Sequence, residues 1–369
     1  MNYKGSYEVF DLSKVKTYPL KVRKNKVELD DFLDVAKLRK SEIRAPKGPW
    51  FRNGERGDGP DQSRGLKELA DYIVKCHKGG KPVAVLSGAH PIKNGQIPIV
   101  IDLIERGIVT LYSTNGAGTI HSFELALTGA SSESVREALP KGDFGMAFET
   151  GAYLNYAIEI AAEKKWGMGE AMGRLYCDKK FRKQVIARTF KHHEDTGEYF
   201  KPYDGFPHAD SCVFAAAHKK GIPICVHASL GTDIIDQHAS FNPAAKGQTS
   251  GADFLIFSKE MCRFTSGGVI LNIGTAIMGP EVVLKAVSLA ANVGCKPDGL
   301  WTGDFDVRGF SFDDKARDES QAYYYLRDQK SIATRIPKVF GGTGFYFEGL
   351  HEETLPPLYQ YIMRGLGVK

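Results

Sequence analysis

Short apolar runs that end in small or polar residues alternate along this chain with segments of helical spacing. The run Pro82–Leu86 ends in Ser-Gly, and Ile108–Tyr112 ends in Ser-Thr-Asn-Gly-Ala-Gly. Between such runs, apolar residues recur at three- and four-residue intervals, as they do from Leu66 to Cys76. Strands followed by glycine-rich turns and then helices are typical of parallel βαβ units. The pattern predicts an α/β fold, doubly wound, with a mainly parallel sheet and helices on both faces.

The same alternation gives approximate bounds for the elements. The expected strands are residues 82–86, 108–112, 222–226, 268–272 and 300–302. The expected helices are residues 66–76, 97–106, 120–127, 212–219, 254–261 and 281–292.

Residues 1–60 break this pattern because they are polar and irregular, and the stretch 45–64 is crowded with glycine, proline and charge. We expect an N-terminal arm, residues 1–60, ahead of a single α/β domain, residues 61–369. Basic residues collect in the arm without interleaved aromatic rings for base stacking, so a solvated, charged arm is expected. The arm would also suit a partner surface.

Composition adds limits to this picture. The chain has 369 residues, of which 42% are hydrophobic and 25% charged, as in ordinary soluble proteins. The net charge of +5 is too small to argue for nucleic acid. Six cysteines show no CxxC pair, and the sequence has no signal peptide or 18-residue apolar run. We expect a cytoplasmic protein with a small-molecule substrate and with neither nucleic acid nor a membrane as partner.

The run Pro223–His238 carries the densest group of reactive side chains. An apolar strand ends there in a turn, and His227, Asp233, Asp236 and His238 follow within twelve residues. Ligands of open α/β sheets bind at the carboxyl ends of the strands. The sequence therefore predicts a site at this strand end.

Three strand ends carry small residues that let backbone N–H groups approach a ligand. They are Ser87–Gly95, Ser113–Gly118 and Asn272–Ala276. Each turn alone is consistent with ordinary strand–helix connections, and Gly116-x-Gly118 lacks the third glycine of a dinucleotide fingerprint. Together, on one sheet edge, they favour a ligand of nucleotide size.

The side chains of His208-x-Asp210, Cys225-x-His227 and Asp233–His238 could supply N, O and S ligands to a metal ion. No HExxH or CxxC spacing supports a metal site, so we expect no metal. Metal-dependent hydrolysis at the His/Asp cluster stays open as an alternative, as does a catalytically silent relative that binds a nucleotide or a partner.

The segment Ile108–Leu127, with Thr114–Gly118, resembles the strand, glycine turn and helix of deoxyhypusine synthases. Residues 222–233 and 269–283 are similar to later strand ends of that family, in the same order. The resemblance implies a homotetramer that uses NAD to oxidise an amine-bearing carbon before group transfer. The NAD contacts that it implies are Ser87, Gly88, Asn115, Gly116, Ala117, Gly118, Asn272, Gly274, Thr302, Gly303 and Asp304.

This sequence differs from the family at positions expected to contact the substrate. Ile120 and His121 replace two acidic residues of the family, and His227 replaces a third acidic residue. The Trp-Gly-Lys segment with the imine-forming lysine is absent; Lys330, after Tyr323–Gln329, is either a displaced equivalent or a surface lysine. We therefore expect a divergent relative with a substrate other than the usual polyamine and protein lysine.

The expected catalytic group is His227, a base with an ordinary pKa near ~6.5. Asp233 would orient it or hold a substrate ammonium, and His121 and Lys330 are further catalytic candidates. The positive charge expected from histidine and lysine favours an anionic or zwitterionic substrate. Each histidine could instead satisfy a backbone carbonyl. The candidate substrate contacts are His90, Lys93, Asp236 and His238.

Overall fold

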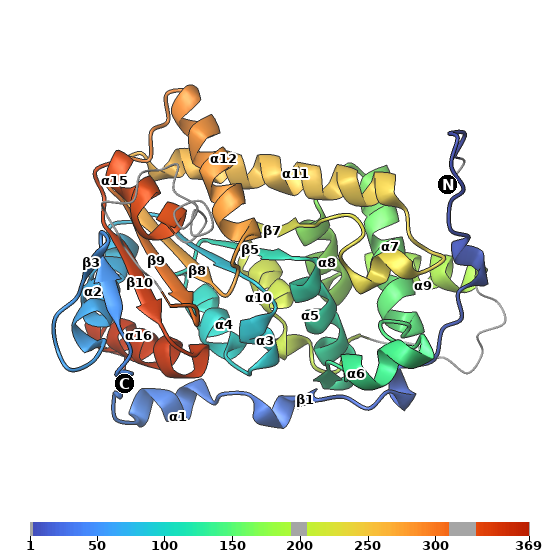
Figure 1. Ribbon diagram of the computed structural model, residues 1–369, viewed down its shortest axis with the longest axis horizontal. Helices are drawn as coiled ribbons and strands as arrows, with labels where there is room; N and C mark the ends of the chain where they lie inside the picture. The colour runs from blue at the N-terminus through green and yellow to red at the C-terminus, as the bar shows by residue number, and fades with distance from the viewer. Residues whose placement is uncertain (1–2, 193–204, 310–329, 369) are drawn as a thin grey trace.

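The computed structural model describes residues 3–192, 205–309 and 330–368. An eight-stranded sheet occupies the left and centre of the view in Figure 1, with helices packed against both faces. The strand order is β3-β2-β10-β9-β8-β4-β5-β7, and the six strands from β10 to β7 are parallel. The expected α/β class with a mainly parallel sheet is confirmed.

The bounds of the elements are as follows. The strands are β1 (Val27–Glu28), β2 (Trp50–Arg52), β3 (Glu55–Arg56), β4 (Val83–Ser87), β5 (Leu111–Asn115), β6 (Ala130–Ser131), β7 (Ile224–His227), β8 (Gly268–Ile273), β9 (Leu300–Asp306) and β10 (Gly344–Glu348). The helices are α1 (Val35–Lys40), α2 (Ser63–Lys78), α3 (His90–Lys93), α4 (Ile97–Glu105), α5 (Gly116–Thr128), α6 (Val135–Ala138), α7 (Phe148–Glu163), α8 (Met168–Cys177), α9 (Lys179–His192), α10 (Val213–Lys220), α11 (Pro243–Met261), α12 (Met278–Asn292), α15 (Ile336–Val339) and α16 (His351–Gly365).

The connectivity reverses direction in the middle of the sheet. From β4 the chain adds β5 and β7 on one side, returns across the sheet, and adds β8, β9 and β10 on the other side. Where the connections that follow two neighbouring strands go to opposite sides of the sheet, a crevice forms at the carboxyl ends of those strands. This crevice is the usual ligand position in such sheets. Here that point lies between β4 and β8.

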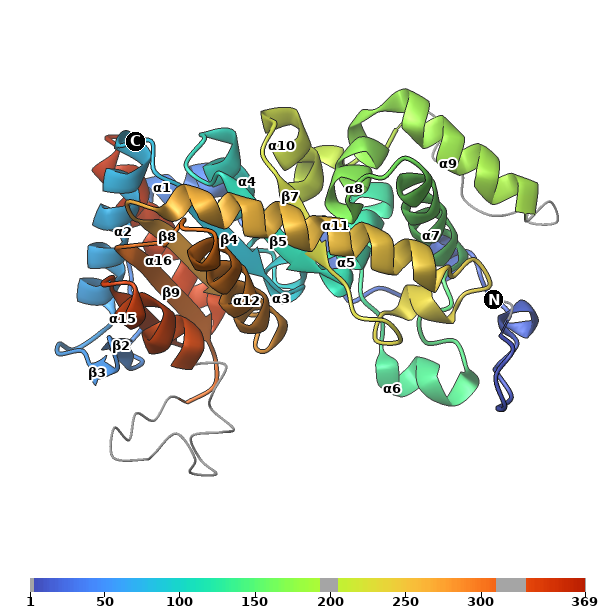
Figure 2. The same ribbon diagram turned by 90° about the horizontal axis from the view of Figure 1, so that it is seen from above.

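Alternating strand residues supply two apolar layers. Val83 and Val85 join the larger core, which also contains Leu66 of α2, whereas Ala84 and Leu86 join the core beneath α11 and α12. Seen from above, α11 runs along the molecule over one sheet face, with α12 beside it (Figure 2). The six parallel strands are buried on both faces, which explains their nearly unbroken apolar runs.

Several elements differ from the expected bounds. α11 begins at Pro243, eleven residues before the expected start, because the Asn242 side chain caps it by accepting a hydrogen bond from Ala245 N–H. α5 likewise begins at Gly116 instead of Ile120. α7 was not predicted: nearly all of its residues are buried, so it lacks the polar stripe that marks a surface helix.

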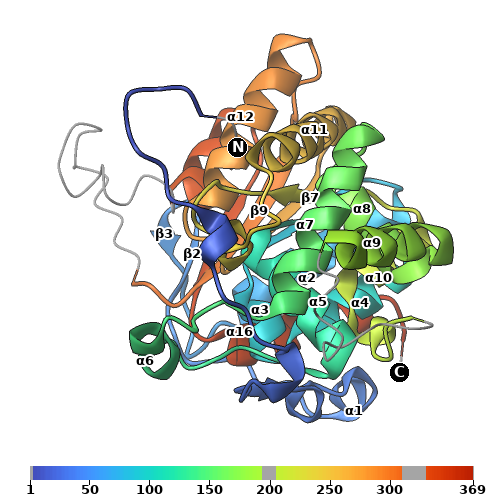
Figure 3. The same ribbon diagram turned by 90° about the vertical axis from the view of Figure 1, so that its right-hand side faces the viewer.

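The arm is built into the body and is not a solvated extension throughout. β2, within residues 1–60, pairs antiparallel with β10, and Trp50 packs into the core. Farther toward the N-terminus, Leu20 is buried and β1 pairs with β6. Figure 3 shows the arm running down one end of the molecule and then beneath it.

No helix in the described ranges is both long enough and apolar enough to cross a membrane.

A buried ion pair fastens the arm to α5. The Arg23 guanidinium donates to both carboxylate oxygens of Glu124, at 2.9 and 2.5 Å. The two side chains are 6% and 1% exposed, and Thr150 Oγ1 and Ser131 Oγ also donate to the carboxylate. Burial by itself would raise the pKa of Glu124, but the adjacent Arg23 lowers it below its ordinary value.

Loss of Arg23 should therefore destabilise the whole fold. Arg23→Met would leave a buried, unpaired carboxylate, at a cost of about 3 kcal/mol in the free energy of unfolding measured with urea. Adding Glu124→Gln should recover part of that loss, and Lys24→Met on the exposed side of the arm should cost almost nothing. A loss in Arg23→Met no larger than in Lys24→Met would show that the pair does not anchor the arm.

Candidate functional site

The residues expected to hold a cofactor lie on the carboxyl ends of neighbouring strands. Leu86 of β4 is in register with Ser113 of β5 and with Asn272 of β8, and Asn272 is in register with Asp304 of β9. Gly88 and Gly274 follow β4 and β8, on either side of the point where the connectivity reverses. The strand order therefore brings these expected residues to one edge.

At this point the backbone leaves little room, since a Cβ on Gly88 would lie 2.3 Å from the carbonyl oxygen of Gly274. A narrow crevice of about 10 Å³ lies next to it, among Ser113, His227 and Met278. Its walls are polar, however. Three buried side-chain atoms around it have no hydrogen-bond partner among the described residues: Ser113 Oγ, His227 Nε2 and Asn272 Oδ1. Buried polar atoms are ordinarily paired, so this cluster marks a place suited to a polar ligand.

His227 ends β7 and lines this crevice. Its ring stands edge-on to Phe257 at 5.4 Å, and it is 8% exposed. Burial lowers its pKa to about 4, whereas the sequence led us to expect a base near ~6.5. His227 is therefore neutral at pH 7 and suited to hydrogen bonding more than to taking up a proton.

Other expected cofactor contacts already have partners within the fold. Ser87 Oγ and Tyr112 OH lie 2.6 Å apart, and Asn115 Oδ1 caps α5 by accepting from Gly118 N–H. Thr302 Oγ1 donates to the carbonyl of Ile332, and Gly303 lies beneath Leu69. The oxygen atoms of these side chains are thus used within the fold and shape the sheet edge.

Asp304 is buried in β9, where Asn272 Nδ2 donates to it at 2.8 Å. Burial raises the pKa of Asp304 to about 7, and the Asn272 hydrogen bond opposes this shift in part. The group is thus half-protonated near neutral pH, next to the unpaired Asn272 oxygen.

A second cavity, of about 220 Å³, lies beside α5 and the loop after β7. Lys93 of α3, Ala117 and His121 of α5, and Asp233 of the β7 loop all line it. Each of these four residues was expected from the sequence, as a cofactor, catalytic or substrate contact. The fold brings them together from three separate segments.

His121 is linked to a buried acid through a serine. Its Nδ1 lies 2.6 Å from Ser131 Oγ, which donates to Glu124 at 2.7 Å. Since the serine proton points to the carboxylate, Nδ1–H donates to Ser131 and Nε2 is left as an acceptor. Burial lowers the pKa of His121 to about 4; Glu124 opposes this effect, while Lys93 and Arg23 add to it.

Asp233 belongs to a buried charge bridge. Lys246 Nζ of α11 donates to Asp233 at 2.8 Å and to Asp236 at 2.6 Å. The Lys246 side chain is 1% exposed. Burial raises the pKa of Asp233, with Lys246 lowering it and Asp236 raising it.

Sequence reasoning missed Lys246, Arg23, Glu124 and Ser131. The signal for Lys246 was present: with Thr249, Asp253 and Phe257 it recurs at three- and four-residue spacing on the buried face of α11. A lysine on such a face is rare unless paired. The expected α11 began after Lys246, and this hid the pattern.

Four expected residues lie away from this second cavity or are otherwise engaged. His90 is exposed and stands edge-on to His351, and His238 Nε2 contacts the carbonyl of Gly145 at 2.8 Å. Asp236 accepts hydrogen bonds from Lys246 and from Gly231 N–H. Lys330 is 4% exposed, so the expectation of a surface lysine is wrong; residues 323–329 before it lie outside the described ranges.

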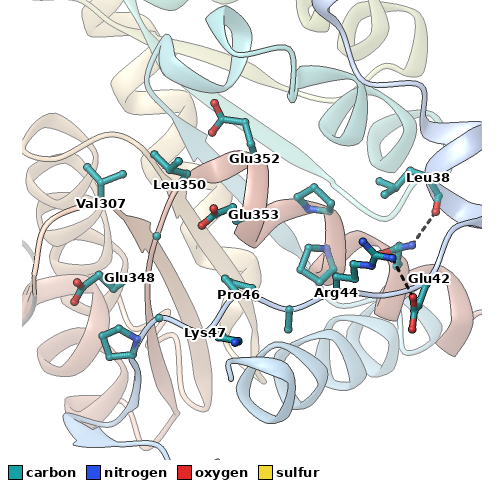
Figure 4. Close-up of a pocket in the computed structure, with 17 residues that line it drawn as sticks. Leu38, Glu42, Arg44, Pro46, Lys47, Val307, Glu348, Leu350, Glu352 and Glu353 are labelled. Atoms are coloured by element: carbon teal, nitrogen blue, oxygen red, sulfur yellow. Dashed lines mark hydrogen bonds and ion pairs between the residues drawn. The ribbon is translucent and has the colours of Figure 1, made fainter. Parts of the chain in front are cut away.

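A larger hollow, about 840 Å³, lies between residues 38–49 of the arm and the start of α16. Figure 4 shows Glu352 and Glu353 on α16 facing it, with Arg44 and Lys47 on the arm side. Both glutamates are exposed to solvent, and none of the expected site residues lines this hollow. The expected residues therefore point to the edge formed by β4, β5, β7 and β8, and to the cavity beside α5.

No group of three or more His, Cys, Asp or Glu residues in the described ranges is placed to hold a metal ion.

No protein-family model matches the chain, and no curated protein does. Solved structures do match, at low similarity. They include apo ArgZ, an arginine dihydrolase from cyanobacteria (13% identity, 82% of this chain and 32% of that chain, TM-score 0.41). They also include AgrE with ornithine and NAD+, at 12% identity over 83% of this chain and 33% of that chain, with a TM-score of 0.42. A third is a LOR/SDH protein of Methanococcus maripaludis S2, at 14% identity over 84% of this chain and 70% of that chain, with a TM-score of 0.40. The chain spans about a third of the length of ArgZ and AgrE.

The resemblance to deoxyhypusine synthases is corrected by these matches, which belong to a different family. The NAD-dependent oxidation and group transfer that the resemblance implied are corrected for the same reason. The physical reason is that glycine turns at the ends of parallel strands are common to many α/β sheets, so their order is weak evidence for one family. At TM-scores of 0.40 to 0.42, the matches themselves carry no argument about the reaction of this chain. The homotetramer stays a prediction.

The buried Asp304 should make stability depend on pH. Its folded pKa, about 7, lies above the unfolded value near ~3.9, so folding favours the protonated form. Stability is therefore lost as pH rises from 4 to 7. One pKa unit corresponds to about 1.4 kcal/mol, so an effect of a few kcal/mol is expected.

Asp304→Asn is neutral at every pH and should lose less stability than the wild type between pH 5 and pH 8, in urea unfolding. Asp298→Asn, at an exposed position, is the matched control and should follow the wild type. Parallel curves for Asp304→Asn and the wild type would contradict a carboxyl with a raised pKa.

Proposed function

We propose that this chain is an enzyme for a small zwitterionic ligand of the amino-acid class. The observation that carries the proposal is the 220 Å³ cavity, which presents both a cation and an anion. The Lys93 side chain has no hydrogen bond or ion pair with any described residue, so its ammonium is available to a ligand carboxylate. Asp233 offers a carboxylate to a ligand ammonium.

His121 would supply the chemistry by moving a proton at Nε2. Ser131 fixes the ring through Nδ1, and Glu124 fixes the serine. Lys93 and Arg23 contribute to the low pKa of His121, so a ligand carboxylate seated on Lys93 would raise that pKa toward neutrality. Binding would thus bring the histidine closer to the range in which it exchanges protons at pH 7.

We further propose that NAD binds at the crevice between β4 and β8. The strand order and the unpaired atoms of Ser113, His227 and Asn272 support a dinucleotide there. Ser113, His227 and Asn272 would hold it, together with backbone groups of the turns at Gly88 and Gly274. A bound nicotinamide dinucleotide would supply a hydride donor or acceptor. Since the crevice holds about 10 Å³, its walls must separate on binding.

The zwitterion proposal predicts a chemical preference. By calorimetry, L-norvaline should bind at least about tenfold more tightly than pentanoate or pentylamine, which each lack one charge. Lys93→Met should bind norvaline no better than pentylamine, and Asp233→Asn no better than pentanoate. The exposed Lys141→Met is the control and should keep the wild-type preference.

Equal affinities for the three compounds would overturn the zwitterion proposal. The enzyme part is tested separately, by following the turnover of L-amino acids with the protein by NMR. His121→Asn should keep norvaline affinity within about threefold and lose turnover, because the variant keeps the cavity but not the proton acceptor. Turnover that persists in His121→Asn would exclude His121.

The NAD proposal predicts opposite effects of one substitution on stability and on binding. Ser113→Ala removes a buried, unpaired hydroxyl, so it should leave stability unchanged or raise it by about 1 kcal/mol. The same change should weaken NAD+ binding in calorimetry about fivefold or more. A destabilised variant with unchanged NAD+ affinity would contradict both the unpaired hydroxyl and its role.

A further inference from the structure

Lys246 reaches from α11 into the loop after β7. Its ammonium donates to Asp233, to Asp236 and to the carbonyl of Ser229 at 2.8, 2.6 and 3.1 Å. The two aspartate side chains are 9% and 5% exposed. Three directed contacts use all three N–H donors of the lysine, so this group is fixed in place.

The two carboxylates of this bridge differ in their surroundings. Asp236 also accepts a hydrogen bond from Gly231 N–H at 2.7 Å, and it does not line the cavity. Asp233 lines the cavity and, among the described residues, accepts hydrogen bonds from Lys246 alone. With two carboxylates and one ammonium, the bridge keeps one negative charge, and Asp233 is the member that a ligand can reach.

The position of Asp233 is also set by α5. A Cβ on Gly116 would lie 2.0 Å from Asp233 Oδ2, so the carboxylate rests against the first residue of that helix. The positive end of a helix favours an anion there. Lys246 holds the same oxygen from the other side.

We propose that Lys246 is a positioning residue, which keeps Asp233 ionised and aimed at the cavity so that it can bind the ammonium of a ligand. This inference rests on the proposed function, because it concerns the same cavity. The specificity for an amine would then depend on a lysine that the ligand does not touch.

The other charged groups near the cavity do not replace Lys246. Arg23 pairs with Glu124 and approaches Glu133 at 3.7 Å, while Asp236 repels Asp233. Lys93 and His121 line the cavity without a hydrogen bond to Asp233. Lys246 is thus the cation within hydrogen-bonding distance of Asp233 in the described ranges.

The test is the pH dependence of L-norvaline binding. Without its cation, buried Asp233 would have a higher pKa and take up a proton near neutral pH. Lys246→Met should therefore bind norvaline at least about tenfold more weakly than the wild type at pH 6.5. Its affinity should recover as pH rises to 8.5, while that of the wild type stays level. Lys246→Arg should restore the level profile, and Lys259→Met, exposed on the same helix, should not alter it.

A ligand-free measurement separates this inference from the proposed function. In the infrared difference spectrum at pH 7, Lys246→Met should show an added protonated-carboxyl band, and Lys246→Met/Asp233→Asn should lack it. If the band appears but the wild type binds no norvaline, the proposed function fails and the role of Lys246 stands. If no band appears, or if Lys246→Met binds norvaline with a level profile, the role of Lys246 is overturned.

Circular dichroism checks that each variant folds. Should Lys246→Met fail to fold, Lys246→Met/Asp236→Asn keeps the net charge of the bridge, and the same band and the same pH profile are expected from it.

Discussion

Charges buried at the carboxyl edge of the sheet must be paired, and the pairing draws distant segments of this chain together. An unpaired charge in such a place lowers the free energy of unfolding by several kcal/mol. Each buried charge therefore requires an oppositely charged partner from another segment. Glu124 on α5 is met by Arg23 from the arm, and the β7 loop is met by Lys246 from α11. The arm, the edge of the sheet and the long helix over it are thereby fixed around one cavity.

The same edge contains polar groups that the fold leaves unpaired. Ser113, His227 and Asn272 carry buried atoms without partners in the described ranges, and Lys93 lines the cavity without an ion pair there. Unpaired buried atoms also occur elsewhere in the described ranges, for example on Trp50, Asn94 and Tyr176, so a missing partner alone does not locate the site. What distinguishes Ser113, His227 and Asn272 is that they come from β5, β7 and β8 near one edge of the sheet.

Much of this architecture could be predicted from local pattern. Buried strands such as Val83–Ser87 appear as apolar runs, and the turns after them marked the edge where Lys93, His121 and Asp233 meet. The individual roles could not be predicted, because they depend on burial and on long-range partners. His227 has an ordinary histidine sequence context, yet burial takes its pKa to about 4. Arg23 and Glu124 lie 101 residues apart, and no local pattern links them.

If one cavity holds the two ends of a zwitterion, a crystal structure of the protein grown with L-norvaline will show it. We expect difference density in the cavity beside α5, with the carboxylate at Lys93, the ammonium at Asp233, and His121 within reach of the ligand. Density for norvaline in the hollow between the arm and α16, or elsewhere with this cavity empty, would contradict this expectation.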